Sequence, residues 1–246
     1  MNLADINTLK SLLLKEGFSF KKSLGQNFLI DETVCPKMAE NSCNENTGVL
    51  EIGPGVGVLT RELSKRAKKV VAIELDERLK KILPKTLGDL DNVEVIFGDA
   101  MKLDLRKIIE EHFDGCESVS VCANLPYYIT SPIIMMLLES KLPITSVTVM
   151  VQKEAALRLC AEVGSRDAGA VTVAVTYYAE KEILFTVDRS SFMPPPNVDS
   201  AVIKLNIRPE PPIMVSDEKR FFSFVKSAFA QRRKTLVNTV CNTQNI

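Results

Sequence analysis

Between residues 48 and 152, short apolar runs rich in valine and isoleucine alternate with segments whose apolar residues recur at helical spacing. The runs that predict strands are 48–53, 69–75, 92–98, 118–124 and 146–152. The segments that predict helices are 58–66, 76–87, 104–112 and 131–140. Because buried strands that alternate with helices form parallel sheets covered on both faces, this pattern restricts the chain to an α/β fold.

The pattern changes after the last of these strands. The stretch AGAVTVAVTYYAEKEILFTV, at 168–187, predicts two strands joined by a short polar turn at Glu180 and Lys181. The stretch SAVIKLNI, at 200–207, predicts one more strand. We therefore expect antiparallel strands at the end of a mainly parallel sheet.

A proline-rich stretch, RPEPPIMVSD at 208–217, interrupts the strands, and helices are expected from about Glu218. We place a domain boundary at this break. The expected large domain spans 1–207, and a small helical domain spans 208–246.

Composition excludes several classes of protein. A chain of 246 residues, 46% of them hydrophobic, can bury a full core. Its apolar runs are far shorter than the roughly 20 residues of a membrane-spanning helix, and the N-terminal MNLADINTLK lacks the basic-then-apolar order of a signal peptide. We expect a cytoplasmic protein with no membrane contact. Six cysteines without C-x-x-C spacing indicate neither a zinc site nor a disulfide framework, so reduced thiols are expected.

The charges are distributed unevenly. The net charge is zero, which argues against a uniformly basic nucleic-acid binder. The segment 211–246, however, carries six basic residues against two acidic ones, and FKKSLGQNF adds Lys21 and Lys22. Charge runs are usually solvated helix faces, so these segments alone support RNA binding only weakly.

Ligands of open α/β sheets bind beyond the carboxyl ends of the strands, so the residues at those ends are informative. The first strand runs into EIGPGVGVLT, which places Gly53, Gly55 and Gly57 at a strand-to-helix turn. A dinucleotide site is one interpretation, but its G-x-G-x-x-G pattern requires a glycine where this chain has Val58. The observed G-x-G-x-G pattern fits better with a cofactor that has no pyrophosphate.

Two acidic residues follow the next two strands. Glu74 stands 21 residues after Gly53, a separation that suits a carboxylate accepting both ribose hydroxyls. Asp99, in FGDAM, can accept the amine of an adenine. Each residue alone could be a helix cap or a solvated acid, and glycines make ordinary turns. Three such signals at successive strand ends favour an adenosine-binding set.

The fourth strand ends in NLPYYIT. The Asn124 carboxamide and the Pro126 carbonyl can each accept a hydrogen from an exocyclic amine, and the Tyr127 ring can stack on a planar base. The structural alternative is a proline turn whose tyrosines pack on the core. Beside an adenosine site, the cluster favours a base-binding role.

Six motifs then resemble those of one family. They are KKSLGQNFLID, VLEIGPGVGVLT, VVAIELDERL, GDAMKLDL, NLPYYITSPII and SFMPPPNVDSAVIKL. Over residues 20–207 they resemble the ribosomal RNA adenine dimethyltransferases, most closely the small-subunit branch. The resemblance implies a Rossmann-like methyltransferase sheet with an antiparallel end, and a small helical C-terminal domain. That domain is expected to be shortened, because the chain stops at Ile246 where relatives continue.

The resemblance also implies a reaction. The family uses S-adenosylmethionine to dimethylate the N6 amines of two adjacent adenosines in the hairpin near the 3′ end of 16S rRNA. The implied substrate is a partly assembled 30S-type particle, and the implied process is ribosome biogenesis. We expect a monomeric enzyme that needs no metal.

The resemblance also assigns the family's site residues to the matching motif positions of this chain. The implied cofactor contacts are Asn27, Leu29, Gly53, Gly55, Glu74, Asp99, Ala100 and Asn124. The implied catalytic and base-binding residues are Asn124, Leu125, Pro126, Tyr127 and, as a second stacking ring, Phe192. We further expect a basic rim that binds RNA, made of Lys21, Lys22, Arg232, Arg233 and Lys234.

Positioning of the amine is then the main catalytic effect, and no general base is required, since a methylated amine is acidic enough to lose its proton. The single histidine, His112, lies in a polar helical stretch and is expected at the surface. Three alternatives stay open. They are the sister family that dimethylates a large-subunit adenosine, a non-catalytic ribosome-assembly or transcription factor, and a small-molecule methyltransferase.

Overall fold

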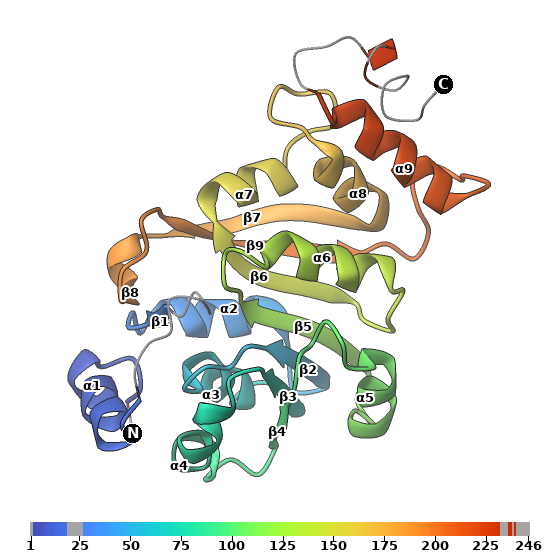
Figure 1. The fold of residues 1–246 in the computed structure, drawn as a ribbon. Coiled ribbons are helices and arrows are strands. Elements are labelled where there is room, and N and C mark those ends of the chain that lie inside the picture. Colours follow the sequence, from blue (N-terminus) through green and yellow to red (C-terminus); the bar gives the residue numbers. More distant parts are fainter. Residues whose placement is uncertain (1, 19–26, 232–235, 238, 240–246) are drawn as a thin grey trace.

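A computed structural model describes residues 2–18, 27–231, 236–237 and 239. Its main sheet has seven strands in the order β4-β3-β2-β5-β6-β9-β7 (Figure 1). They are β2 (Thr47–Ile52), β3 (Lys69–Glu74), β4 (Val93–Phe97), β5 (Ser118–Asn124), β6 (Ser146–Gln152), β7 (Ala179–Val187) and β9 (Ser200–Ile207). Strands β2 to β6 are parallel, whereas β9 is antiparallel to both β6 and β7. The expected mainly parallel sheet with an antiparallel end is confirmed.

A second, two-stranded sheet joins distant parts of the chain. Strand β1 (Phe28–Leu29) pairs antiparallel with β8 (Phe192–Met193). The helices are α1 (Ile6–Lys15), α2 (Val34–Ser42), α3 (Val58–Ser64), α4 (Leu83–Leu87), α5 (Leu105–His112), α6 (Thr130–Glu139), α7 (Lys153–Leu159), α8 (Ala170–Tyr178) and α9 (Glu218–Phe229). Short 3₁₀ helices span Glu77–Lys81 and Arg189–Ser191. The described helices include none that is both long and apolar enough to cross a membrane.

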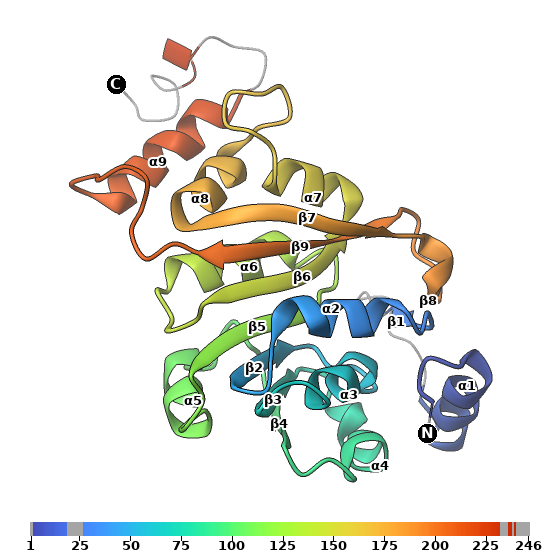
Figure 2. The same ribbon diagram turned by 180° about the vertical axis from the view of Figure 1, so that it is seen from behind.

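Helices bury both faces of the main sheet. Successive strand residues point to opposite faces, so Leu50 belongs to the core cluster that contains α5 and α6, while Val49 belongs to the cluster of α2 and α3. Figure 1 shows α6 in front of the sheet, and Figure 2 shows α2 on the opposite side. Burial on both faces explains why these strands are continuous apolar runs.

One expected strand is wrong. Residues 170–178 form helix α8, and the chain becomes extended only in β7, where Glu180 and Lys181 lie inside the strand instead of in a turn. The alternating valines of AVTVAVTYY are typical of a strand, but Thr172 and Val175 are buried at helical spacing. The Gly169 N–H also donates to Thr172 Oγ1 at 2.9 Å, which caps the helix. Tertiary burial here outweighs the β propensity of the β-branched residues.

Helix α9 follows the proline-rich break and packs against α8. Phe222 stacks on Tyr178, with ring centroids 5.4 Å apart, and meets Tyr177 edge to face at 5.3 Å. The Glu218 carboxylate accepts a hydrogen bond from the Tyr178 hydroxyl at 3.3 Å and pairs with Lys141 at 2.9 Å. Helix α9 is thus fixed to the helical layer of the sheet. The division between 1–207 and 208–246 stays a prediction.

Candidate active site

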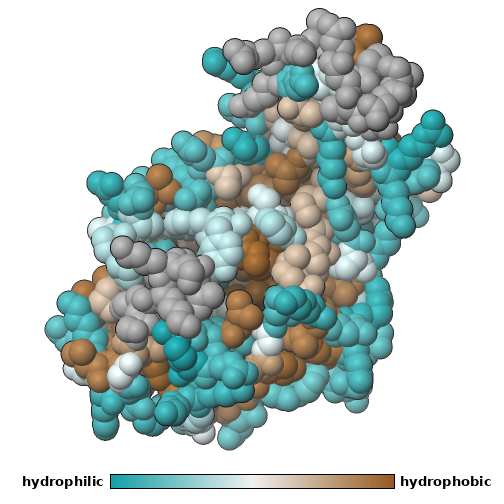
Figure 3. Space-filling view, in the orientation of Figure 1, coloured by the Kyte–Doolittle hydropathy of each residue, from teal (hydrophilic) through white to brown (hydrophobic). Residues whose placement is uncertain are grey.

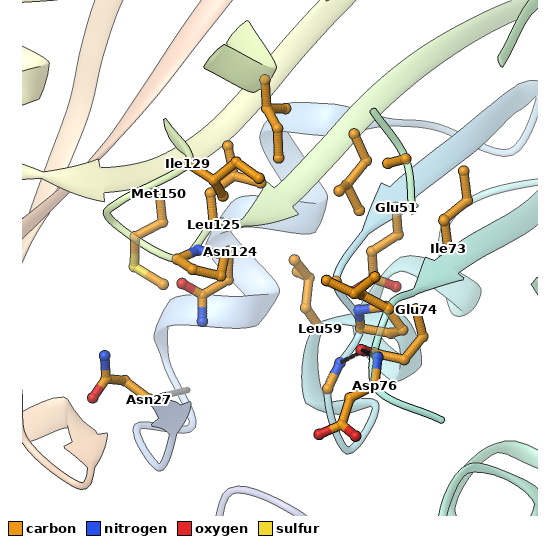
Figure 4. A pocket seen from close by; sticks show the side chains of 18 of the residues that line it. Asn27, Glu51, Leu59, Ile73, Glu74, Asp76, Asn124, Leu125, Ile129 and Met150 are labelled. Atoms are coloured by element: carbon orange, nitrogen blue, oxygen red, sulfur yellow. Dashed lines mark hydrogen bonds between the residues drawn. The ribbon is translucent and has the colours of Figure 1, made fainter. Parts of the chain in front are cut away.

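One pocket lies at the carboxyl ends of β2, β3, β4 and β5 (Figure 4). It is lined by all of the residues expected to contact the cofactor or the target base, namely Asn27, Leu29, Gly53, Gly55, Glu74, Asp99, Ala100, Asn124, Leu125, Pro126, Tyr127 and Phe192. Parallel strands end at the same edge of a sheet, and this brings the four strand ends together. Asn27 and Leu29 join them through β1, and Phe192 through β8.

The turn that contains Gly53, Gly55 and Gly57, here called the glycine loop, leaves open space beside the backbone. Gly53 has a φ of +75°, in the left-handed region that side chains rarely adopt, and a β-carbon placed there would meet no atom within 4 Å. The Gly53 N–H donates to the Ile73 carbonyl at 2.9 Å, which holds the loop against β3. At Gly53 the loop therefore presents backbone without a side chain to the pocket, whose wall Pro54 and Val56 also line.

Glu74 is a buried carboxyl group at the end of β3. Its Oε2 accepts a hydrogen bond from the Gly55 N–H at 3.1 Å, and its Oε1 accepts one from the Asp76 N–H at 2.7 Å (Figure 4). Burial raises its pKa to about 7, although these two hydrogen bonds favour the ionised form. Glu74 thus ties the glycine loop to β3 and can still accept hydrogens from ribose hydroxyls through its remaining lone pairs.

Asp99 lies at the end of β4. Its Oδ1 accepts a hydrogen bond from the Met101 N–H at 3.0 Å, and its Oδ2 lies 3.5 Å from Lys102 Nζ. The carboxylate is thereby held at the pocket wall beside Ala100.

The residues after β5 form a hydrogen-bonded turn. The Pro126 carbonyl accepts the Ile129 N–H at 3.1 Å and the Thr130 hydroxyl at 3.3 Å, so both of its lone pairs are in use. Among the described residues, the Leu125 carbonyl accepts no hydrogen bond, and the Asn124 carboxamide, which points into the pocket, makes none either. Asn124 and Leu125 therefore each offer the pocket an oxygen that has no hydrogen-bond partner in the described part of the chain. The expectation that Pro126 receives an amine hydrogen does not agree with this turn.

Aromatic rings complete this end of the pocket. The Tyr127 hydroxyl lies 2.8 Å from Ser200 Oγ, and Ser200 is fully buried at the start of β9. Burial raises the pKa of Tyr127. Ser200 pairs with Gln152 on one side and Val187 on the other, so the atom that holds Tyr127 belongs to a central strand. Phe192 is buried and lines the same pocket from β8.

Sequence reasoning missed Glu51, which lies inside β2 and lines the pocket (Figure 4). Only 1% of the residue is exposed, and its Oε2 has no hydrogen-bond partner within the described part of the chain. Burial raises its pKa to about 8, so the carboxyl group is mostly neutral at pH 7. A charged residue in an otherwise apolar strand was the available signal.

Glu51 should make stability depend on pH. Its pKa is about 8 in the folded protein and near 4.5 when exposed, so stability falls as pH rises from about 4.5 to about 8. We expect Glu51→Gln to remove this loss, and the variant to gain on the order of a few kcal/mol relative to the parent protein between pH 5 and pH 9. Urea unfolding without added ligand measures the difference. Glu40→Gln, at an exposed position on α2, is the control. A difference between Glu51→Gln and parent that does not change with pH would contradict the assignment.

Other sequence expectations concern residues outside the pocket. His112 lies on α5, hydrogen-bonds to Glu94 at 2.9 Å and does not line the pocket. No group of three or more metal-ligating side chains occurs in the described ranges. Of the six cysteines, the five that are described are free thiols, and Cys35 and Cys122 are buried. The expected RNA-binding residues Lys21, Lys22, Arg232, Arg233 and Lys234 all lie outside the described residues.

The fold and this pocket define a class of protein. The protein combines a seven-stranded sheet that has an antiparallel end with an open glycine loop and a buried carboxyl group, Glu74, hydrogen-bonded to that loop. These features are typical of an S-adenosylmethionine-dependent methyltransferase. The open space beside Gly53 and the inward-facing Glu74 fit this cofactor. The chain belongs to the ribosomal RNA adenine dimethylase family, which matches residues 17–245.

The sequences of individual relatives agree with this family assignment. The chain is 52% identical over 242 residues to ribosomal RNA small subunit methyltransferase A of Geobacillus thermodenitrificans, covering 98% of this chain and 83% of the relative. It is also 52% identical over 234 residues to the protein of that name in Bacillus licheniformis, covering 95% and 80%.

Two solved structures share the fold. One is a dimethyladenosine transferase from Plasmodium falciparum, with a TM-score of 0.73 and 30% identity over 89% of this chain and 78% of the other. The second is the 23S rRNA methyltransferase ErmE, with a TM-score of 0.70 and 32% identity over 88% and 84%.

Proposed function

We propose that this protein dimethylates the N6 amines of two adjacent adenosines in the hairpin near the 3′ end of 16S rRNA. The observation that carries the proposal is the single pocket in which Glu74 and the glycine loop meet the Asn124–Tyr127 turn. The target subunit is supported by 52% identity to small-subunit methyltransferases, against 32% to the 23S enzyme.

Two oxygens of this chain can hold the amine. An adenine amine is a weak nucleophile, because its lone pair is delocalised into the purine ring. Asn124 Oδ1 and the Leu125 carbonyl have no hydrogen-bond partner among the residues that the structure describes, so they can accept its two hydrogens. Leu125 takes the part first expected of Pro126. Acceptors on both hydrogens favour a pyramidal nitrogen with an available lone pair.

The methyl transfer itself needs few groups. When bound, S-adenosylmethionine supplies a methyl group on a positively charged sulfur. The sulfur would keep the electron pair of the S–C bond that breaks as the amine nitrogen takes the methyl group. The amine then carries a positive charge and releases a proton to water. The residues near the pocket therefore contribute position and hydrogen-bond acceptance rather than a general base.

Tyr127 is proposed to stack on the target base, with Ser200 holding the ring in place. Tyr127→Phe and Ser200→Ala remove the same hydrogen bond, so each should lower kcat/KM by roughly threefold to tenfold. The double variant should lose no more than either single one, with the S-adenosylmethionine Kd unchanged. Steady-state kinetics on unmethylated small subunits measures this cycle. Losses that simply add would show that Ser200 acts independently of Tyr127.

We also propose the oligomeric state of the enzyme, its location, the particle on which it acts and the residues that bind the RNA backbone. We expect a monomer that acts in the cytoplasm on a partly assembled small subunit. Lys21, Lys22, Arg232, Arg233 and Lys234 remain the proposed basic rim for the RNA backbone. If they form it, charge reversal at Arg232 and Arg233 weakens RNA binding and reduces its salt dependence.

One experiment tests the function as a whole. The purified protein is incubated with radiolabelled S-adenosylmethionine and small subunits from cells that lack this modification. Label in dimethyladenosine of the 3′-terminal hairpin is the expected result. Large subunits without their own adenine dimethylation serve as the second substrate. Label on large subunits alone would assign the protein to the branch of the 23S enzyme, and tight binding without label would assign it a non-catalytic role.

A further inference from the structure

The second tyrosine of NLPYY has surroundings unlike those of the first. The hydrogen bond from the Ile129 N–H to the Pro126 carbonyl closes a turn with Tyr127 and Tyr128 at its two central positions. Tyr127 is half-buried and held by Ser200. Tyr128 is 58% exposed, lines the same pocket and makes no hydrogen bond or ring contact with any described residue. An unpartnered aromatic ring thus stands at the mouth of the pocket.

Exposed apolar side chains form part of that mouth. Figure 3 shows hydrophobic side chains within a hollow near the middle of the face, surrounded by hydrophilic ones. Leu75 and Met101 are also exposed and line the pocket. They come just after Glu74 and Asp99, on the side where the cofactor's ribose and adenine are expected. Tyr128 follows Asn124 instead, so it belongs to the side of the RNA substrate.

If the substrate is RNA, an exposed aromatic ring at the mouth of the pocket has a specific use. A base that enters the pocket must leave its stack, which exposes one face of the neighbouring base and costs a few kcal/mol. Stacking on an exposed aromatic side chain is the usual way for proteins to compensate an unpaired base, and it requires no specific hydrogen bond. Because the turn is closed and Tyr127 is tied to β9, Tyr128 is the ring of this pair left available for a second base.

We infer that Tyr128 is a second base platform, which stacks on the nucleotide adjacent to the target adenosine while that adenosine occupies the pocket. The inference rests on the proposed function, since it requires an RNA target. In that target the neighbour is itself an adenosine, and a purine offers a large face for stacking. The site then takes a dinucleotide, and the same platform serves whichever of the two adenosines is outside the pocket.

Kinetics of three variants test the platform. On unmethylated small subunits, Tyr128→Ala should lower kcat/KM roughly tenfold, mainly through KM, while Tyr128→Phe retains the parent value, because the ring and not the hydroxyl stacks. The S-adenosylmethionine Kd should stay unchanged in both. Leu157→Ala, which removes another exposed apolar side chain outside the pocket, is the control. Equal kcat/KM for Tyr128→Ala and the parent protein would overturn the inference.

A change in the RNA identifies the contact. Small subunits are reconstituted with rRNA in which one of the two adenosines is replaced by an abasic nucleotide, and methylation of the other is measured. On these particles the kcat/KM of the parent enzyme should fall about as much as Tyr128→Ala lowers it on unmodified particles. The kcat/KM of the Tyr128→Ala variant should fall little further. Independent, additive losses would show that Tyr128 does not touch this neighbour. Failure of the parent enzyme to methylate unmodified particles would instead reject the proposed function.

Discussion

Asn124→Ala should lower kcat for methyl transfer to unmethylated small subunits by roughly 100-fold to 1,000-fold, the usual loss when a preorganised hydrogen-bonding group is removed from an active site. The carboxamide points into the pocket and has no partner among the described residues, so its oxygen is available to the amine (Figure 4). The Leu125 carbonyl alone would then hold the amine by one hydrogen.

A matched variant separates this effect from damage to the fold. Asn206 lies exposed on β9 and does not line the pocket, so Asn206→Ala should keep the parent kcat. Single-turnover assays with saturating S-adenosylmethionine isolate the chemical step from cofactor binding, to which Asn124 is also expected to contribute. A single-turnover rate for Asn124→Ala within threefold of the parent would remove Asn124 from the catalytic step.

The pocket was predictable from the sequence because its parts stand at strand ends. Gly53, Glu74, Asp99 and Asn124 each follow an apolar run, and parallel strands deliver their carboxyl ends to one edge of a sheet. The apolar runs and the shared edge of the parallel sheet were together sufficient to group these four residues before any of their contacts was known.

Features that depend on contacts between distant segments were not predictable. The valines of α8 suggest a strand until the helices around them are known. The two hydrogen bonds that occupy the Pro126 carbonyl come from residues three and four positions later, and only the folded turn reveals them. Glu51 looked like one polar residue in an apolar run, and its importance comes from burial against the pocket.

Glu74 should make cofactor binding depend on pH. Ribose hydroxyls donate hydrogens, so they bind the carboxylate better than the neutral acid. The pKa of Glu74 in the free protein is about 7, so below this pH binding must first remove a proton. The S-adenosylmethionine Kd should therefore rise by up to roughly tenfold for each pH unit below 7 and level off above it.

Glu74→Gln identifies the group responsible. An amide can accept one hydroxyl hydrogen but has no charge, so Kd at pH 8 should rise roughly 10-fold to 100-fold, about the value of one hydrogen bond to a charged group. The variant should also lose the increase in Kd below pH 7. Equilibrium dialysis from pH 6 to pH 8.5 measures both proteins with the same ligand, so titration of the cofactor's own amino group, with a pKa near 8, affects them equally. Parallel Kd curves for the two proteins would mean that the pH dependence belongs to the ligand or to another residue, and that Glu74 binds the ribose in one protonation state throughout.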